Sequence, residues 1–225
     1  LRLRDPGYSV SCDKRLHLAV SIRSFRAESI SNFVKVLLDD DKQKAKELLR
    51  EISSRYPIVL TRDIEKAKIW LKIKARGTER YGFLASSGGI RLRPIGINVQ
   101  AKIDVVNWFL NGKNDIRSSY FLEEVATEFD VQGLELDWSC VAWDADLRYG
   151  SFGWEYKSFR GTDWQNINDE SRKRYLKNTY RVLLTRARQG MVILVPYGNE
   201  NDHTRKPAFY DATFNFLQDL GFDTL

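Results

Sequence analysis

Basic side chains are concentrated in one stretch near the carboxyl end of the sequence. Between residues 172 and 188 there are seven lysines and arginines and no aspartate or glutamate. They are Arg172, Lys173, Arg174, Lys177, Arg181, Arg186 and Arg188. A guanidinium carries a permanent charge and a planar fork of donors that matches phosphate. Charge alone favours a solvated helix face over a phosphate-facing surface, but the net charge of +6 agrees with a polyanionic partner.

Side chains for metal or nucleophilic chemistry are scarce. The 225 residues include two cysteines, Cys12 and Cys140, and two histidines, His17 and His203. A zinc site usually takes four Cys or His ligands at characteristic short spacings, and these four side chains are too few and too far apart to match them. No metal site is therefore expected. Neither histidine lies in a recognisable nucleophile motif, which argues against a hydrolase that uses a Ser-His-Asp or Cys-His arrangement.

The sequence also lacks a standard phosphate-binding loop. Such a loop reads G-x-x-x-x-G-K-[ST], because the glycines free backbone N–H groups to surround the phosphates and the lysine reaches the terminal ones. Gly77 and Gly82 have the glycine spacing, but Phe83 stands in the lysine position. Gly112 is followed by a lysine, but Asn107 replaces the first glycine. By itself the chain is therefore not expected to form a nucleotide cradle.

Short apolar runs alternate with amphipathic stretches along the chain, the pattern of an α/β fold with a mainly parallel sheet flanked by helices. The apolar runs predict strands at 17–22, 58–60, 82–86, 123–127, 138–143 and 191–195. The helical spacings predict helices at 24–38, 42–52, 63–77, 97–110, 169–187 and 207–220. Residues 147–168 have weak periodicity and are expected to form an ordered insertion, such as a hairpin. The absence of any apolar run of membrane-spanning length predicts a soluble, cytoplasmic protein.

Three segments resemble motifs of superfamily I helicases. The run Leu183-Leu-Thr-Arg-Ala-Arg188, followed by an apolar strand, resembles motif VI. Thr127-Glu-Phe-Asp-Val-Gln-Gly-Leu-Glu135 precedes another strand and resembles motif V. The segment from Leu18 to Arg26 resembles motif IV, although Ser24 stands where these helicases usually have glutamine.

Over residues 16–225 the sequence is similar to the Schlafen-group DNA/RNA helicase-like family. The similarity is carried by segments 123–137, 180–188, 195–198 and 202–205. It implies a RecA-like domain at 16–225, with residues 1–15 a linker, and a position as the second of two motor domains. The upstream RecA-like domain of the same protein would then carry the phosphate-binding loop and the carboxylate that holds Mg²⁺, and the sequence given would begin after it.

The resemblance also implies roles for individual residues around ATP and nucleic acid. Arg186 of motif VI and Arg26 of motif IV would act on the γ-phosphate, where an arginine neutralises charge during transfer. The expected nucleotide contacts are Glu135 to the ribose, Gly133 and Gln132 beside it, and Phe25 against the adenine. Thr127 would contact a phosphate of single-stranded DNA or RNA.

Two alternatives stay open at this point. The first is a non-catalytic nucleic-acid-binding module that keeps a RecA-like fold. The absence of a phosphate-binding loop from the upstream sequence would favour this alternative. The second is a nuclease, which needs clustered acids at strand ends, and Asp144 and Asp146 are the nearest pair.

Overall fold

A six-stranded parallel sheet forms the centre of the protein. The computed structural model describes the chain from Phe25 to Leu225, with side chains from residue 27 onward. The sheet order is β3-β2-β4-β8-β1-β9, and every pair of neighbours is parallel. The strands are β1 (Ile58–Thr61), β2 (Tyr81–Ala85), β3 (Val125–Ala126), β4 (Leu136–Ala142), β8 (Ala187–Leu194) and β9 (Asp223–Thr224). The α/β, RecA-like fold class predicted from the sequence is confirmed. The strand expected at 17–22 and the linker at 1–15 lie outside the described residues.

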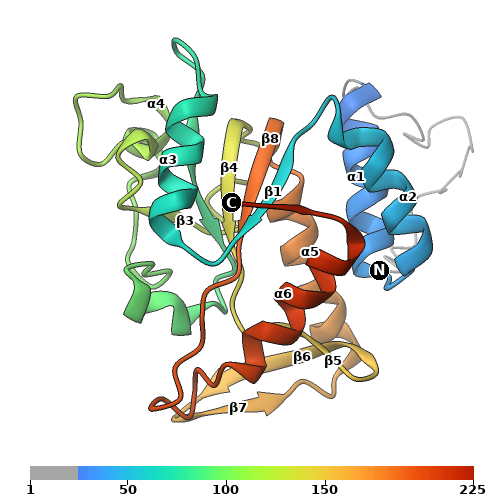
Figure 1. The fold of residues 1–225 in the computed structure, drawn as a ribbon. Helices are drawn as coiled ribbons and strands as arrows, with labels where there is room; N and C mark the ends of the chain where they lie inside the picture. The colour runs from blue at the N-terminus through green and yellow to red at the C-terminus, as the bar shows by residue number, and fades with distance from the viewer. Residues whose placement is uncertain (1–24) are drawn as a thin grey trace, which may run out of the picture.

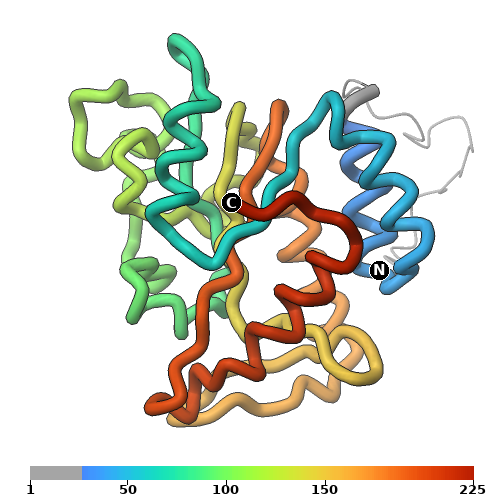
Figure 2. Tube along the Cα trace, in the orientation of Figure 1, coloured from blue at the N-terminus to red at the C-terminus, as the bar shows by residue number. Residues whose placement is uncertain are grey.

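Helices cover both faces of this sheet (Figure 1). The α-helices are α1 (Phe25–Leu38), α2 (Lys42–Ser53), α3 (Ile64–Lys74), α4 (Val105–Leu110), α5 (Glu170–Leu184) and α6 (Ala208–Leu220). In the described part of the chain, two short 3₁₀ helices, η2 (Ile90–Ile95) and η3 (Ser119–Phe121), lie in the connections. Figures 1 and 2 show α3 on one side of the sheet, and α1, α2, α5 and α6 on the other. The short helix α4 packs through Trp108 with the second group.

Two apolar cores result from the alternation of side chains along the strands. In β8, Met191 and Ile193 pack with α1, α2, α5 and α6, whereas Val192 and Leu194 pack with α3. Because a central parallel strand is covered on both faces, its buried stretch is apolar on both faces, as residues 191–194 are. Strand β8 lies between β4 and β1, as the run 191–195 predicted. Gly190 allows this close packing, since a Cβ there would lie 2.6 Å from the Pro57 carbonyl oxygen and 2.7 Å from the Trp138 ring.

The predicted insertion is a second, smaller sheet rather than a single hairpin. Strands β5 (Leu147–Gly150), β6 (Gly153–Arg160) and β7 (Asp163–Asn166) form an antiparallel meander. It lies below the main sheet in Figure 1, with α6 packed against β5. This meander forms one wall of the pocket described below.

Capping side chains explain where the helices begin. Asp63 accepts hydrogen bonds from the backbone N–H groups of residues 65 and 66, and Asp169 from that of Arg172. Aspartate is a preferred N-cap residue, so the sequence predicts a cap at Asp63 and one at Asn168 or Asp169, and the structure has the second at Asp169. The helix predicted at 97–110 is wrong in its first half. Asn98 accepts a hydrogen bond from the Gln100 N–H in a local turn, and Asp104 caps the helix, so α4 begins at Val105.

Candidate functional site

The loop that resembles motif V joins opposite edges of the sheet. It leaves the carboxyl end of β3 at Thr127 and enters the amino end of β4 after Glu135. Thr127 is buried, and its N–H and hydroxyl both donate to Asp130 Oδ2, at 2.8 and 2.7 Å. The Thr127 carbonyl accepts hydrogen bonds from the N–H groups of Asp130 and Val131. In this arrangement the Thr127 hydroxyl closes the turn instead of facing solvent.

The exposed tip of the same loop contains Gln132 and Gly133. Gly133 has φ of 79°, in the left-handed region, and a Cβ there would have no heavy atom within 4 Å. The glycine is thus required by the backbone conformation and not by crowding. Glu135, two residues later, is half-buried at the entry to β4.

Arg186 connects this loop to the end of α5. Its side chain is 9% exposed, and its Nε donates to the Val182 carbonyl at 3.1 Å. Its Nη1 lies 3.4 Å from the carbonyl oxygens of both Val131 and Leu134 in the loop. Those two contacts are at the long end of hydrogen-bonding range, so they are weak. The predicted helix to residue 187 is too long, because the Arg186 carbonyl already accepts the Leu136 N–H at 3.0 Å and joins the sheet.

A second group of charged side chains lies beside Arg186 at the amino edge of β4 and β8. Arg188 pairs with Asp137 at 2.7 Å, and Asp137 also accepts the Arg80 N–H at 2.7 Å. Glu79 accepts from the Trp138 indole at 3.0 Å and from the Gln189 amide at 2.7 Å. The Trp138 hydrogen bond is the main cause that lowers the pKa of Glu79 to about 2. Sequence reasoning missed Glu79 and Asp137, because the side chains that donate to them are 51 or more residues away in the chain.

The structure brings together four of the predicted site residues. Arg186 contacts the loop that carries Gln132, Gly133 and Glu135, all at the amino edge. Thr127 belongs to the same loop but lies at the opposite, carboxyl edge. Phe25 and Arg26 begin α1, and their side chains lie outside those described.

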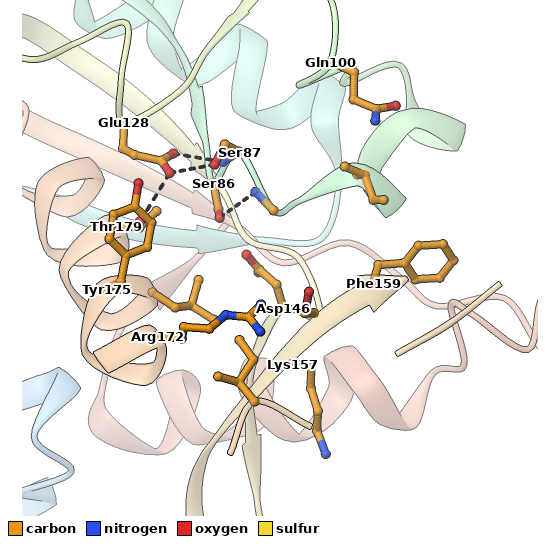
Figure 3. A pocket seen from close by; sticks show the side chains of 15 residues that line it. Ser86, Ser87, Gln100, Glu128, Asp146, Lys157, Phe159, Arg172, Tyr175 and Thr179 are labelled. Carbon is orange, nitrogen blue, oxygen red and sulfur yellow. Dashed lines mark hydrogen bonds between the residues drawn. The ribbon is translucent and has the colours of Figure 1, made fainter. Parts of the chain in front are cut away.

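A pocket of about 390 Å³ lies at the carboxyl edge of the sheet, between α5 and the meander. Its polar lining comes from Ser86 and Ser87 after β2, Glu128 after β3, Asp146 after β4, Lys157 on β6, and Arg172 and Thr179 on α5. Figure 3 shows Glu128 above the pocket beside Ser87 and Thr179, with Lys157 at the other end. Glu128 accepts from Ser87 N–H at 2.9 Å, from Ser87 Oγ at 2.7 Å and from Thr179 at 3.3 Å. The carboxylate therefore fixes the loops that form the pocket.

A comparison with family models identifies the chain. Residues 3–197 match the model of the Schlafen group 3, DNA/RNA helicase domain. The chain belongs to this family. A search of the curated proteins and a search of the solved structures each returned no match.

The Schlafen-type helicase domain contains a buried acidic pair behind the pocket. Asp144 and Asp146 follow β4 and are each 1% exposed. Tyr210 donates to Asp144 at 2.8 Å, and Tyr180 to Asp146 at 2.6 Å. Burial, and then the neighbouring Asp144, raise the pKa of Asp146 to about 7. Within the described residues no group of three or more His, Cys, Asp or Glu could hold a metal, and this pair instead receives tyrosine O–H groups from α5 and α6.

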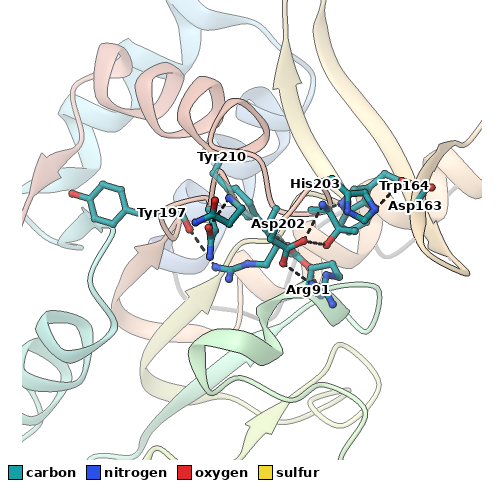
Figure 4. Close-up of polar contacts among 12 residues, drawn as sticks. Arg91, Asp163, Trp164, Tyr197, Asp202, His203 and Tyr210 are labelled. Carbon is teal, nitrogen blue, oxygen red and sulfur yellow. Dashed lines mark hydrogen bonds and ion pairs between the residues drawn. The ribbon is translucent and has the colours of Figure 1, made fainter.

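The segment 202–205, which carried part of the resemblance, is a structural turn in this family member (Figure 4). Asp202 accepts from the Thr204 N–H and hydroxyl, at 3.0 and 2.6 Å, and pairs with Arg91 at 2.8 Å. The Thr204 carbonyl accepts from the Trp164 indole at 2.7 Å. The turn thereby joins η2 and the meander to the start of α6. No helix among the described residues has the length and apolar character needed to cross a membrane.

Proposed function

We propose that this chain is the second motor domain of a superfamily I helicase-like ATPase, working with an upstream RecA-like domain that supplies the phosphate-binding loop and the Mg²⁺ ligand. The observation that carries the proposal is the contact between Arg186 and the loop of residues 127–135 at the amino edge of β4 and β8. The two segments that resemble motifs V and VI, separated by some 50 residues of chain, form one local structure.

The residues at this edge fit one side of a nucleotide site. The Arg186 guanidinium donates to neutral acceptors, the carbonyl oxygens of Val182 at 3.1 Å and of Val131 and Leu134 at 3.4 Å. A phosphate oxygen would be a stronger, charge-assisted acceptor, so bound ATP would draw the guanidinium out of the loop. Glu135 is half-buried beside the open space around Gly133, where its carboxylate would accept from a ribose hydroxyl. ATP would supply the phosphoryl group, and Arg186 would neutralise the charge that develops during its transfer.

The decisive experiment is steady-state ATP hydrolysis by a protein that contains this chain and an upstream phosphate-binding loop. We expect hydrolysis that single-stranded nucleic acid stimulates, and we expect this chain alone to show none above background. Arg186→Ala should lower kcat by about 10²-fold or more, with a smaller change in nucleotide affinity. Because Arg186 is buried, circular dichroism must show that the variant is folded.

Arg188→Ala is the matched control, because it removes a neighbouring arginine whose side chain is 59% exposed. We expect hydrolysis close to that of the parent protein. If Arg188→Ala abolishes hydrolysis and Arg186→Ala does not, the motif register is wrong. If neither variant affects kcat, the ATPase proposal fails.

A second candidate function is supported by the hydrogen bonds that Arg186 already makes. Three carbonyl oxygens accept from its guanidinium, which is also what a purely structural arginine would do. On this basis the domain would be a non-catalytic nucleic-acid-binding module. The same hydrolysis experiment separates the two, because a module of this kind binds single strands and leaves ATP intact.

A further inference from the structure

Two exposed aromatic rings lie side by side at the carboxyl edge of the sheet. Phe129, in the loop of residues 127–135, is 56% exposed, and Tyr175, on α5, is 54% exposed. Their ring centroids are 6.4 Å apart and their planes are inclined by 33°. Burying each of them would be favourable, so a pair that stays exposed is typical of a binding surface. Stacking platforms for nucleobases are built from such rings.

Two arginines lie near this pair, together with the Glu128 carboxylate, which already accepts hydrogen bonds from Ser87 and Thr179. Arg172 lines the pocket one helical turn before Tyr175, and its side chain forms no ion pair with any residue in the described part of the chain. Arg174 is exposed on the same helix, and α5 has no acidic residue after Glu170. Unpaired guanidinium groups beside exposed rings are suited to a ligand that carries both phosphate and a flat ring.

Tyr175 itself lines the pocket of about 390 Å³, so the rings and the cavity form one continuous surface. This volume is within the range of about 300–1,000 Å³ that small-molecule sites have. The hydroxyls of Ser87 and Thr179 in its wall already donate to Glu128, so the wall mainly offers acceptors, among them the carboxyl groups of Glu128 and Asp146. A neutral planar ring with N–H donors on its edge matches that lining. The carboxyl edge of a parallel sheet is also where α/β folds bind ligands.

We infer that this surface binds one nucleotide of a single-stranded nucleic acid, with its base stacked on Tyr175 and Phe129, its edge in the pocket, and an adjacent phosphate on Arg172. This inference rests on the proposed function, in which the domain forms part of a single-strand track. It also changes which residue makes the contact. The Thr127 hydroxyl is buried and donates to Asp130, whereas Phe129, two residues later in the same loop, faces solvent.

The test is fluorescence anisotropy with a labelled single-stranded oligonucleotide and with the same sugar-phosphate chain lacking bases. Tyr175→Ala should weaken binding of the normal oligonucleotide about 10-fold, the usual effect of removing one stacking ring, and Phe129→Ala should weaken it by a similar factor. Neither variant should change binding of the abasic strand. Arg172→Ala should weaken binding of both strands and reduce the dependence of the affinity on salt.

Two controls keep the result specific. Tyr175→Phe retains the ring and should bind like the parent, and Phe152→Ala removes a fully exposed ring from the turn between β5 and β6, away from the pocket, and should also bind like the parent. All four aromatic variants change exposed or half-exposed side chains, so they should remain folded.

The outcomes separate this inference from the proposed function. If the domain binds oligonucleotides but Tyr175→Ala and Phe129→Ala bind like the parent, the single-strand track stands and the stacking surface is wrong. If no oligonucleotide binds at any salt concentration, the nucleic-acid part of the proposed function fails as well. If free mononucleotides bind, and neither the normal nor the abasic oligonucleotide displaces them, the pocket is a site for free nucleotides and the inference is overturned.

Discussion

The two edges of the central sheet hold their charged side chains in opposite ways. At the amino edge, Arg188 pairs with Asp137 near the surface, and Arg186 donates to neutral carbonyl oxygens of α5 and of the loop. At the carboxyl edge, Asp144 and Asp146 are fully buried, and each receives a short hydrogen bond from a tyrosine. A charge held by neutral acceptors or near the surface can change partners when a charged ligand arrives, whereas a buried, hydrogen-bonded network fixes the fold. The proposed function therefore predicts that side chains change partners at the amino edge, while the buried acidic pair and its tyrosines form a fixed frame at the carboxyl edge.

The largest expected effect is the change in the free energy of unfolding with pH that the buried Asp146 carboxyl group causes. Asp146 has a pKa of about 7 in the folded protein, whereas an unfolded aspartate titrates near pH 4. Between these values the folded state holds the additional proton, so the free energy of unfolding falls as pH rises, by at most about 1.4 kcal/mol per pH unit, and levels off above about pH 7.

Urea denaturation across that pH window tests this prediction. Asp146→Asn should remove most of the downward slope, because asparagine keeps the shape without the titration. Glu200→Gln, which removes an exposed carboxylate, is the control and should keep the slope of the parent. Equal slopes for the parent and Asp146→Asn would show that Asp146 does not hold a proton in the folded state.

The next effect is the loss of a hydroxyl from the frame. Tyr180 is fully buried, and its O–H donates to Asp146 at 2.6 Å. Tyr180→Phe removes this hydrogen bond and also the acceptor of the Asp144 N–H, which lies 3.3 Å from the Tyr180 oxygen, whereas Asp146 keeps the hydrogen bond from the Leu147 N–H at 2.9 Å. The loss should lower the free energy of unfolding by about 1–3 kcal/mol. Tyr175→Phe, on the exposed face of the same helix, should change it by less than about 0.5 kcal/mol. Equal denaturation midpoints for the two variants would mean that the Tyr180 hydrogen bond adds nothing.

Local patterns in the sequence predicted the fold well, because helix spacing, aspartate caps and buried apolar runs are properties of short segments. The parallel arrangement of β8 and the start of α5 after Asp169 follow from such signals. The end of α5 was placed at residue 187, although it lies at Leu184, because the Thr185 hydroxyl turns back to the Arg181 carbonyl and Arg186 joins the sheet. Whether residues 185–187 continue the helix or join the sheet depends on their contacts with β4, which a pattern within the segment does not contain.

The site was predicted unevenly for the same reason. The motif segments indicated that Arg186 and Gly133 belong together, and the structure places them in contacting segments. The burial of Thr127 and the pairing of Phe129 with Tyr175 depend on contacts between the loop and α5, which spacing along the chain does not encode. Whether Arg186, Glu135 and the other predicted residues contact ATP stays a prediction.

A smaller effect concerns the backbone of the amino-edge loop. Gly133 and Gly112 both have open space where a Cβ would be, but Gly133 has φ of 79°. Gly133→Ala should therefore lower the free energy of unfolding by about 1 kcal/mol, because an L-residue is strained in the left-handed region. Gly112→Ala should be neutral or slightly stabilising, since alanine reduces the freedom of the unfolded chain. Thermal denaturation of the two variants separates the effect of backbone conformation from that of crowding, because neither added Cβ meets a neighbouring atom. Equal midpoints would contradict a strained backbone in Gly133→Ala.

The smallest expected effect is that of the surface ion pair at the amino edge. Arg188→Ala removes a side chain that is 59% exposed, and Asp137 keeps its hydrogen bond from the Arg80 N–H at 2.7 Å. Solvent screens such a pair, so the free energy of unfolding should fall by less than about 1 kcal/mol and the difference should shrink as salt is added. Urea denaturation at low and high salt measures both quantities. A decrease in the free energy of unfolding as large as that of Tyr180→Phe, or one that salt leaves unchanged, would mean that the amino edge is held as rigidly as the carboxyl edge. In that case Arg186 would have no freedom to exchange its carbonyl partners for a phosphate.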